Sequence, residues 1–394
     1  MAHAFDLVIV GGGIHGVGIA QRAAAAGYRV LLLEKAAIAA GTSSRSSKLI
    51  HGGLRYLETG QLRLVRESLH ERTALLRLAP ELVRLRRFHI PVYADTRRRP
   101  WILATGLALY AGLAGFAGGA GFGLVPSKEW GALDGLTTRG LERVFWYHDG
   151  QTDDAALARA VWASALRLGA EAALPATFIS AERRDAEVVV RYAADSTLRE
   201  CRTKVLVNAA GPWAAHVARE ITPAIPVPDV ELVQGTHLLL QAAPPARGIY
   251  YVESPRDGRA IFVMPFHGAL MIGTTELRYR AGPDEVTPTA GESHYLLGIL
   301  RRYFPDVAAT GTASPPRAFA GLRVLPGGPG HAFHRSRETH LAVDREQTPR
   351  VISIYGGKLT TFRATAAQVL RRIASSLPAR HAIADVDTLP LTPA

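Results

Sequence analysis

Cysteine is almost absent from this sequence, with Cys201 the only one among 394 residues. A single thiol excludes an intrachain disulfide, a CxxC redox pair and a cysteine metal cluster, so redox chemistry requires a bound cofactor. We therefore expect Cys201 to be buried, and we expect no metal site. Lysine is also scarce, because only five of the 46 basic residues are lysine. A lysine within a motif thus indicates that a compact ammonium group is needed there.

Long runs of like charge are missing as well. The longest basic cluster is Arg97–Arg99, and no basic run has interleaved aromatic residues. This pattern argues against a nucleic-acid partner, while the net charge of +12 suits an anionic substrate, a phosphate-bearing cofactor or an anionic membrane surface. Residues 1–6 lead into an apolar strand without a basic leader, which predicts a cytoplasmic protein. The length favours two domains.

One segment, residues 101–126, lacks charge entirely. Its length is compatible with a membrane span, but seven glycines lie between positions 106 and 123 and no strongly apolar face repeats. Two other interpretations stay open. The segment is a loosely packed part of the core or substrate domain, or it is a surface that dips into a membrane interface with Arg97–Arg99 at the headgroups beside Trp101.

The first thirty residues form a strand, helix, strand pattern, with strands over 5–10 and 29–34 and a helix over 14–26. Gly11, Gly13 and Gly16 make a G-x-G-x-x-G turn after the first strand, where glycines allow a tight turn, close approach of a pyrophosphate and close packing of the helix. Glu34 ends the second strand and is placed to bind a ribose diol. The pattern predicts a Rossmann-like α/β domain that binds a dinucleotide, without deciding between NAD and FAD.

The remaining patterns predict two domains that alternate along the chain. A helix is expected over 153–168, strands over 173–180, 187–192, 198–202 and 205–210, and a strand at 350–355 followed by a helix to 376. Alternating segments between 225 and 313 indicate an antiparallel sheet. We assign residues 1–80, 145–224 and 318–394 to the cofactor domain, and residues 81–144 and 225–317 to the substrate domain.

Residues 41–58, GTSSRSSKLIHGGLRYLE, are dense in hydroxyls and glycines yet contain too many bulky residues for a flexible loop. At this segment the sequence closely resembles the FAD-dependent glycerol-3-phosphate dehydrogenase family, within the amino-acid-oxidase-like flavoproteins. Further matches are DD at 153–154, NAAGPW at 208–213, GTH at 235–237, GTTE at 273–276, GLRVL at 321–325 and GGKLTTFR at 356–363.

The resemblance implies FAD as cofactor and oxidation of sn-glycerol 3-phosphate to dihydroxyacetone phosphate, with electrons passed to a quinone at the membrane. It also implies a set of cofactor-binding residues: Gly11, Gly13, Ile14, His15, Gly16, Glu34, Lys35, Thr42, Ser43, Ser47, Lys48, Leu49, His51, Gly52, Ala210, Gly211, Trp213, Gly357, Lys358, Leu359 and Thr360.

The expected chemistry selects the remaining residues. Loss of a proton from the C2 hydroxyl requires a base or hydrogen-bond acceptor, for which His237 and His51 are the candidates, with Arg323 beside them. A phosphate dianion requires converging cations, and the substrate-binding set is Arg55, Tyr56, Arg323, Arg337 and Lys358. Lys358 has a second candidate role, because a cation near the flavin N1 stabilises the reduced ring.

The sequence ends at Ala394, whereas members of the resembled family commonly carry a further helical domain. We expect the flavin and phosphate sites to be retained, while the electron acceptor and the oligomeric state stay open. One alternative is a related flavin enzyme that acts on a secondary amine or a 2-hydroxy acid, or that uses oxygen as acceptor. Another is a flavin-binding protein without turnover.

Overall fold

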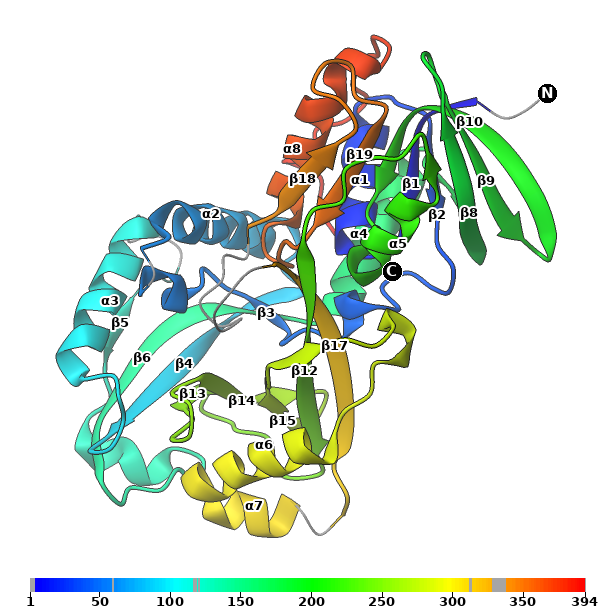
Figure 1. Cartoon of the computed structure of the whole chain (residues 1–394). Coiled ribbons are helices and arrows are strands. Elements are labelled where there is room, and N and C mark those ends of the chain that lie inside the picture. Colours follow the sequence, from blue (N-terminus) through cyan, green and yellow to red (C-terminus); the bar gives the residue numbers. More distant parts are fainter. Residues whose placement is uncertain are drawn as a thin grey trace.

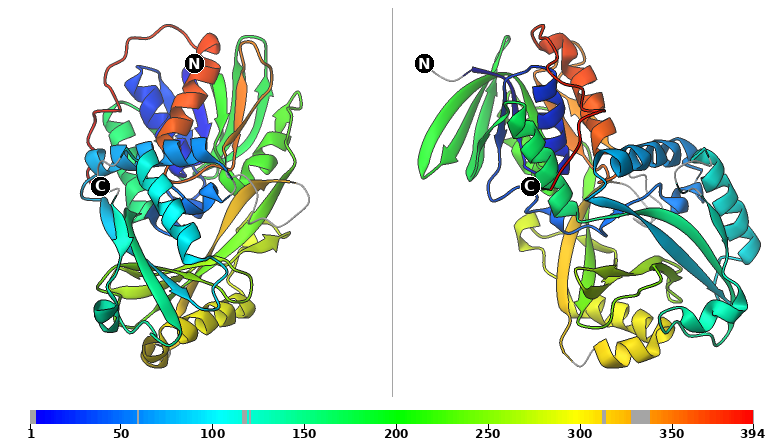
Figure 2. Two further views of the ribbon diagram at one scale, coloured as in Figure 1. Left: turned by 90° about the vertical axis from the view of Figure 1, so that its left-hand side faces the viewer. Right: turned by 180° about the vertical axis from the view of Figure 1, so that it is seen from behind.

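The structure is a computed structural model, and it describes residues 4–58, 60–115, 119, 121–311, 314–327 and 338–393. The chain forms two lobes, each built on its own sheet (Figure 1). Strands β12 (Val230–Leu240) and β17 (Arg317–Pro326) run from one lobe into the other. The views in Figure 2 show the same division from the side and from behind.

The first sheet confirms the predicted α/β fold. Its parallel centre consists of β7 (Glu171–Ala173), β2 (Val30–Leu33), β1 (Ala4–Val10), β10 (Thr197–Asn208) and β19 (Val351–Tyr355), and β18 (His340–Val343) is antiparallel to β19. Side chains alternate along β1, so that Leu7 and Ile9 face one core and Val8 and Val10 face another.

Helices α1 (Ile14–Ala25), α4 (Asp154–Arg167) and α8 (Phe362–Ile373) cover the face of Leu7 and Ile9. The alanine-rich face of α1 allows this close packing, because small side chains let α4 and α8 approach its backbone. The side chain of Asp153 accepts a hydrogen bond from the Ala156 amide and caps α4 at its first turn. The predicted strand, helix, strand unit is thus confirmed.

The opposite face is covered by an antiparallel extension, β8 (Ala176–Arg183), β9 (Val188–Ala194) and the first half of β10, with β11 (Ile221–Thr222) at its edge. The two strands predicted at 198–202 and 205–210 are one strand, which was missed because Arg202 and Lys204 are exposed while Thr203 is buried between them. Cys201 is buried here as expected, and burial raises the pKa of its thiol to about 12.

The second lobe is built on a mostly antiparallel sheet in the order β16 (Leu277–Tyr279), β12, β15 (Ala269–Gly273), β14 (Ala260–Phe266), β13 (Ile249–Glu253), β4 (Val83–Tyr93), β6 (Leu141–Thr152) and β3 (Leu49–Ile50). Strand β17 pairs with β12, and β5 (Phe122–Leu124) pairs with β6. Residues 317–326 and 145–152 therefore lie in the sheet of the substrate lobe, whereas the predicted boundaries placed 318–326 and 145–152 with the cofactor domain.

Both faces of this second sheet are covered by helices. Helices α6 (Ala290–Tyr303) and α7 (Pro305–Gly311) pack on one face, and α2 (Leu62–Leu78) and α3 (Pro100–Leu113) pack on the other. Short helical turns occupy the connections: η1 (Thr42–Ser44), η2 (Leu54–Leu57), η3 (Ser127–Ala132), η4 (Gly211–Trp213), the short helix α5 (Ala214–Arg219), η5 (Pro283–Glu285) and η7 (Ala374–Ser376).

Helix α3 belongs to the uncharged segment and lies at the outer edge of the second lobe (Figure 1). One side buries Leu103, Leu107 and Tyr110, while Trp101 is 70% exposed and Leu109 is 44% exposed. Within the described residues no helix is long and apolar enough to cross a bilayer. The packed side of α3 agrees with the interpretation as part of the substrate domain.

Candidate active site

The glycine turn is shaped by contacts that leave no room for a β-carbon. At Gly11 the backbone has a φ of +109°, and a β-carbon there would lie 2.6 Å from the carbonyl oxygen of Ala209. At Gly16 it would lie 1.9 Å from the carbonyl oxygen of Gly11. These glycines bring α1 against the end of β1, which points the amide groups of the α1 N-terminus into the turn.

Two polar side chains complete this turn. The carboxylate of Glu34 accepts hydrogen bonds from the amides of Gly12 at 2.7 Å and Ala36 at 2.8 Å. The hydroxyl of Ser43 accepts a hydrogen bond from the Ile14 amide at 2.9 Å. The first turn of α1 contains no acidic residue. The helix N-terminus therefore offers a site for an anion, and the Glu34 carboxylate beside it can accept hydrogen bonds from hydroxyl groups of a ligand.

The segment 41–58 connects the other predicted motifs. The Thr42 hydroxyl donates to the carbonyl of Leu322 in β17 at 2.7 Å. The Ser47 hydroxyl lies 3.0 Å from Nε2 of His237 in β12. The His51 amide donates to the hydroxyl of Thr360 at 3.2 Å. Three motifs that are far apart in the sequence therefore meet at this segment.

Lys48, expected to contact the cofactor, forms a buried ion pair instead. Its ammonium group lies 2.6 Å from the carboxylate of Asp154, and the two side chains are 4% and 0% exposed. It also donates to the carbonyl of Ser44 and lies above the rings of Phe266 and Phe319, 5.2 and 5.3 Å from their centres. Sequence reasoning noted Asp154 only as part of the DD motif, because a pairing across about a hundred residues leaves no local signal.

Replacing Lys48 by methionine should lower the free energy of unfolding by about 3–5 kcal/mol, because the Asp154 carboxylate would stay buried without its counter-ion. Urea unfolding of the flavin-free protein measures this loss. The double variant Lys48→Met/Asp154→Asn should recover a large part of it, and Lys128→Met at an exposed position is the matched control. Equal stability of Lys48→Met and wild type would refute a structural role for the pair.

His237 is held as a neutral ring. Its side chain is 2% exposed and stacks on Phe319 with ring centres 5.0 Å apart. Burial, then Arg323 and Lys48, lower the pKa of His237 to about 3. While Nε2 contacts Ser47, Nδ1 has no hydrogen-bond partner among the described residues. A neutral imidazole can accept a hydrogen bond or a proton, which suits the role predicted for His237.

Lys358 and Arg55 meet at one aromatic ring. The ammonium of Lys358 lies 3.8 Å from the centre of the Tyr56 ring, and the guanidinium carbon of Arg55 lies 5.5 Å from it. Tyr56 itself is 4% exposed. Two cations gathered at one ring provide a favourable position for an anion. The sequence predicted all three residues for substrate binding, and the structure brings them together.

Arg323 lies on β17 and takes part in a polar cluster that includes residues not predicted from the sequence. It donates to the carbonyl of Thr275 at 2.9 Å and lies 3.3 Å from the carboxylate of Glu276, which is also 3.0 Å from Arg259. The GTTE motif was the available signal for Glu276, whereas nothing near Arg259 pointed to this site. Arg337 lies outside the described residues.

Several other predicted cofactor residues serve the packing around the turn. A β-carbon at Gly52 would lie 2.5 Å from the hydroxyl of Tyr110, which accepts from the Gly52 amide and donates to Asp149. The side chains of Leu49 and Leu359 pack in hydrophobic clusters, so only their backbones are free to face a ligand. The structure thus assigns Leu49, Gly52 and Leu359 a packing role.

The predicted residues at 210–213 lie next to the glycine turn but also contact the second lobe. Gly11 approaches Ala210, while Gly211 lines a separate pocket described below. Lys35 lies 4.3 Å from the Trp213 ring centre, and both side chains bind the carboxylate of Asp284, at 2.6 and 3.0 Å. In this structure Lys35 and Trp213 thus join the two lobes through Asp284, which the sequence did not single out.

The loop after β19 reaches the start of α1. A β-carbon at Gly357, where φ is +91°, would lie 2.4 Å from Nε2 of His15. Nδ1 of His15 is buried without a hydrogen-bond partner in the described part of the chain, and burial lowers the pKa of His15 to about 4. The predicted residues at both ends of the chain are therefore neighbours around the glycine turn.

Comparison with known proteins agrees with this geometry. The model of the FAD-dependent oxidoreductase family, described as "FAD dependent oxidoreductase", matches residues 6–369. The chain belongs to this family. A D-erythritol 1-phosphate dehydrogenase of Brucella abortus is 34% identical over 95% of this chain and 74% of its own length. A glycerol-3-phosphate dehydrogenase of Pseudomonas tolaasii is 35% identical, with 95% and 72% covered.

This FAD-dependent oxidoreductase also resembles a solved structure with the cofactor bound. The glycerol-3-phosphate dehydrogenase from Bacillus halodurans complexed with FAD superposes with a TM-score of 0.74 and 26% identity. The match covers 95% of this chain and 66% of that one. The fold, the flavin and the enzyme class predicted from the sequence are thereby confirmed.

The residues of the oxidoreductase fit FAD. Gly13 leaves open space at the N-terminus of α1, where a β-carbon would approach only the Ser43 hydroxyl, at 3.2 Å. That space suits a pyrophosphate, and the Glu34 carboxylate beside it suits a ribose diol. His15 contributes a buried ring nitrogen that lacks a partner among the described residues. FAD supplies the hydride acceptor, and the chain supplies the groups that hold it.

Acidification should destabilise the flavin-free oxidoreductase below pH 6.5. Burial lowers the folded-state pKa values of His15 and His89 to about 4 and of His237 to about 3, whereas an unfolded histidine titrates near 6.5. These three histidines therefore do not reduce the free energy of unfolding above pH 6.5. As the pH falls towards 4 they do reduce it, by up to about 2 kcal/mol for each histidine at pH 5. Denaturant unfolding at pH 7 and 5 measures it.

His89→Phe provides the control for this pH dependence, because His89 is buried and stacks on Tyr250 with ring centres 5.1 Å apart. The variant should lose less stability between pH 7 and pH 5 than the wild type. An unchanged pH dependence would contradict the assignment to His89.

Proposed function

We propose that the enzyme oxidises a polyol phosphate, sn-glycerol 3-phosphate in the first instance, to dihydroxyacetone phosphate. The observation that carries this proposal is the pair of cations, Lys358 and Arg55, at the Tyr56 ring in an FAD-dependent oxidoreductase. A phosphate dianion needs more than one cationic donor, and these two come from segments three hundred residues apart. Arg323 is the third cation of the proposed site.

His237 acts on the substrate hydroxyl in this proposal. Its imidazole is neutral because burial lowers its pKa to about 3, so it would accept the hydrogen bond of the C2 hydroxyl, and bound FAD would supply the hydride acceptor. Ser47 fixes the ring through Nε2, and Phe319 fixes its plane. His51 is the second candidate for this role. Its backbone amide binds Thr360, which places it next to the loop that carries Lys358.

The deciding experiment is anaerobic mixing of the yellow protein with sn-glycerol 3-phosphate, followed at the flavin absorbance. Bleaching supports the proposal. D-erythritol 1-phosphate belongs in the same series, because a relative that is 34% identical carries that substrate in its name. Bleaching by sarcosine or 2-hydroxyglutarate, but by neither phosphate, would reassign the substrate. A protein that no donor bleaches would indicate flavin binding without turnover.

For the electron acceptor we propose a quinone reached at a membrane surface, with α3 as the contact. Its exposed side carries Trp101, Ile102 and Leu109, at 70, 41 and 44% exposure, and no charge. Arg97 and Arg99 are exposed just before this helix and suit anionic headgroups. Arg98 does not serve this purpose, since it binds Glu58 and Glu253 at 2.6 and 2.7 Å.

We expect the amount of the triple variant Trp101→Ser/Ile102→Ser/Leu109→Ser that floats with phosphatidylglycerol vesicles to be at least about tenfold lower than that of the wild type. The reason is that three apolar side chains no longer enter the membrane interface. Leu198→Ser, at a residue that is 65% exposed on the first sheet, is the control. Equal recovery of the triple variant and the wild type would contradict the assignment of α3. Flavin reduction by substrate should be unaffected in both variants.

A further inference from the structure

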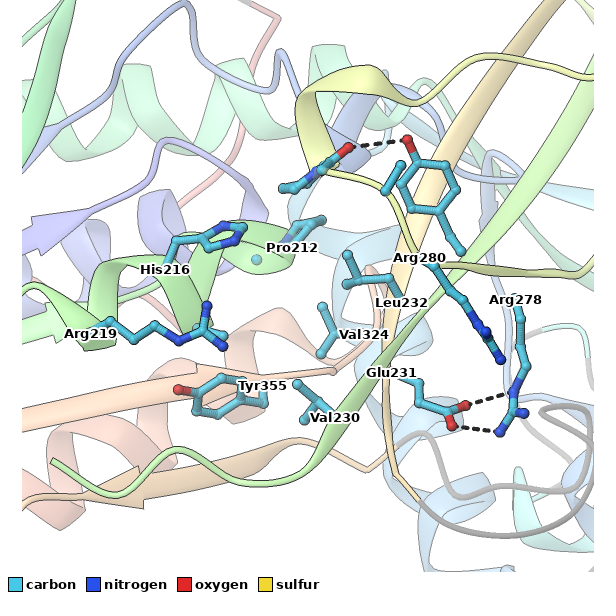
Figure 3. Close-up of a pocket in the computed structure, with 16 residues that line it drawn as sticks. Pro212, His216, Arg219, Val230, Glu231, Leu232, Arg278, Arg280, Val324 and Tyr355 are labelled. Carbon is cyan, nitrogen blue, oxygen red and sulfur yellow. Dashed lines mark hydrogen bonds and ion pairs between the residues drawn. The ribbon is translucent and has the colours of Figure 1, made fainter.

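A pocket of about 410 Å³ lies between the lobes (Figure 3). Its walls come from η4 and α5 of the first lobe, the start of β12, the end of β16, and single residues of β17 and β19. Val324 lines this pocket, and the next residue towards the N-terminus, Arg323, points to the other face of the strand. The pocket and Arg323 are therefore on opposite faces of β17.

The floor of this interlobe pocket is apolar. Pro212, Val230, Leu232 and Val324 lie next to one another at its centre (Figure 3). Leu232 and Val324 are register neighbours across β12 and β17, so their side chains form a continuous patch. Such a surface suits the apolar part of a small molecule, and the volume lies in the range of ligand pockets.

The rim is basic. Arg219 and Arg280 stand on opposite sides of the floor, and neither forms an ion pair with any residue that the structure describes (Figure 3). Arg278 beside Arg280 is different, because it binds the carboxylate of Glu231 at 2.5 Å. Within a single pocket, one arginine is thus neutralised by a carboxylate while two others are left for an anion.

Tyr355 places a further polar group at one end of the pocket. The side chain is 2% exposed, and its hydroxyl has the Ser353 side chain, on the same strand, as a hydrogen-bonding neighbour. The hydroxyl lies at the Arg219 end of the pocket (Figure 3). A hydroxyl group can both donate and accept a hydrogen bond, so Ser353 uses only part of its capacity, and a ligand oxygen at this end would use the rest together with the guanidinium group.

We propose that the interlobe pocket binds an organic phosphate, whose apolar body covers the floor and whose phosphate is held by Arg219 and Tyr355 or, across the floor, by Arg280. The assignment is independent of the substrate proposed above, since Arg219, Arg280 and Tyr355 are not among the predicted substrate-binding or cofactor-binding residues. Both parts of the ligand are required, because an exposed arginine alone binds inorganic phosphate only weakly in water.

The test is calorimetric titration of the FAD-loaded enzyme with phenyl phosphate, compared with inorganic phosphate. Phenyl phosphate should bind at least about tenfold more tightly, and Arg219→Gln/Arg280→Gln should weaken it at least about tenfold. Ala215→Trp, which fills the pocket with a bulky side chain, should also abolish binding. Arg167→Gln/Arg301→Gln removes the same charge from exposed positions elsewhere and should leave the affinity unchanged.

Lys358→Met separates this pocket from the candidate active site. Phenyl phosphate binding that persists in Lys358→Met and is lost in Arg219→Gln/Arg280→Gln supports the proposal, whatever the substrate proves to be. The opposite pattern, or inorganic phosphate binding as tightly as phenyl phosphate, would overturn it. Arginine-dependent binding to phosphatidylglycerol vesicles, with none to phenyl phosphate, would assign the same phosphate chemistry to a lipid headgroup.

Discussion

Gly13→Val is expected to yield a folded protein that retains less than about a tenth of the wild-type flavin. Gly13 has a φ of −74°, which any residue adopts, and only the Ser43 hydroxyl lies near the position of a new β-carbon. The valine side chain therefore does not disturb the protein backbone. It fills the space at the α1 N-terminus into which the pyrophosphate must fit, so the loss falls on cofactor binding.

The ratio of flavin absorbance to protein absorbance after purification measures this effect. Gly298→Val is the matched control, because Gly298 lies in α6 with nothing within 4 Å of a new β-carbon. Unfolding of the flavin-free forms shows whether the fold is retained, and Gly13→Val should match the flavin-free wild type. Normal flavin content in Gly13→Val would refute the placement of the cofactor at this turn.

The first thirty residues were predictable because each local signal agrees with the others. The apolar strand, the glycine turn and the alanine-rich helix specify one βαβ unit, and the observed bounds differ from the predicted ones by a residue at most ends. The segment 41–58 was predictable for another reason, since its composition suits neither a core nor a disordered loop. In both segments the residues that allow the prediction lie close together in the sequence.

Pairing over long distances was not predictable in this way. The sequences of β6 and β17 indicate strands, but residues 141–152 and 317–326 do not indicate to which sheet each strand belongs. That choice depends on partners such as β4 and β12, because paired residues are at least 48 positions apart between β4 and β6 and at least 78 between β12 and β17. The predicted boundary at 318 assigned most of β17 to the cofactor domain, whereas β17 pairs with β12 in the second sheet.

The roles of cationic side chains were also not predictable from the local sequence. Lys48, Arg98 and Lys358 all looked available for an anion in the sequence, yet Lys48 is neutralised by Asp154 and Arg98 by two glutamates. Lys358 lies over the Tyr56 ring beside Arg55. Whether a cation binds a ligand or stabilises the fold depends on which carboxylate the fold brings to it, and only the three-dimensional structure shows that.

Lys358→Met should reduce kcat/KM for sn-glycerol 3-phosphate by about 100-fold or more, because a charge-assisted contact to phosphate is worth about 3 kcal/mol. Methionine retains the apolar stem over the Tyr56 ring, so the packing of Tyr56 should be unchanged. Lys358→Arg should restore part of the activity by restoring the charge. Lys128→Met, at an exposed position, is the control and should have wild-type kinetics.

The reduction potential of the bound flavin separates the two roles of Lys358. If its ammonium binds the substrate phosphate, Lys358→Met raises KM, leaves the potential unchanged, and has no effect on slow oxidation of glycerol, which lacks the phosphate. If the ammonium instead stabilises the reduced flavin, the potential falls and both donors slow down together. Wild-type kinetics for both donors would remove Lys358 from the site and, with it, the strongest argument for a phosphorylated substrate.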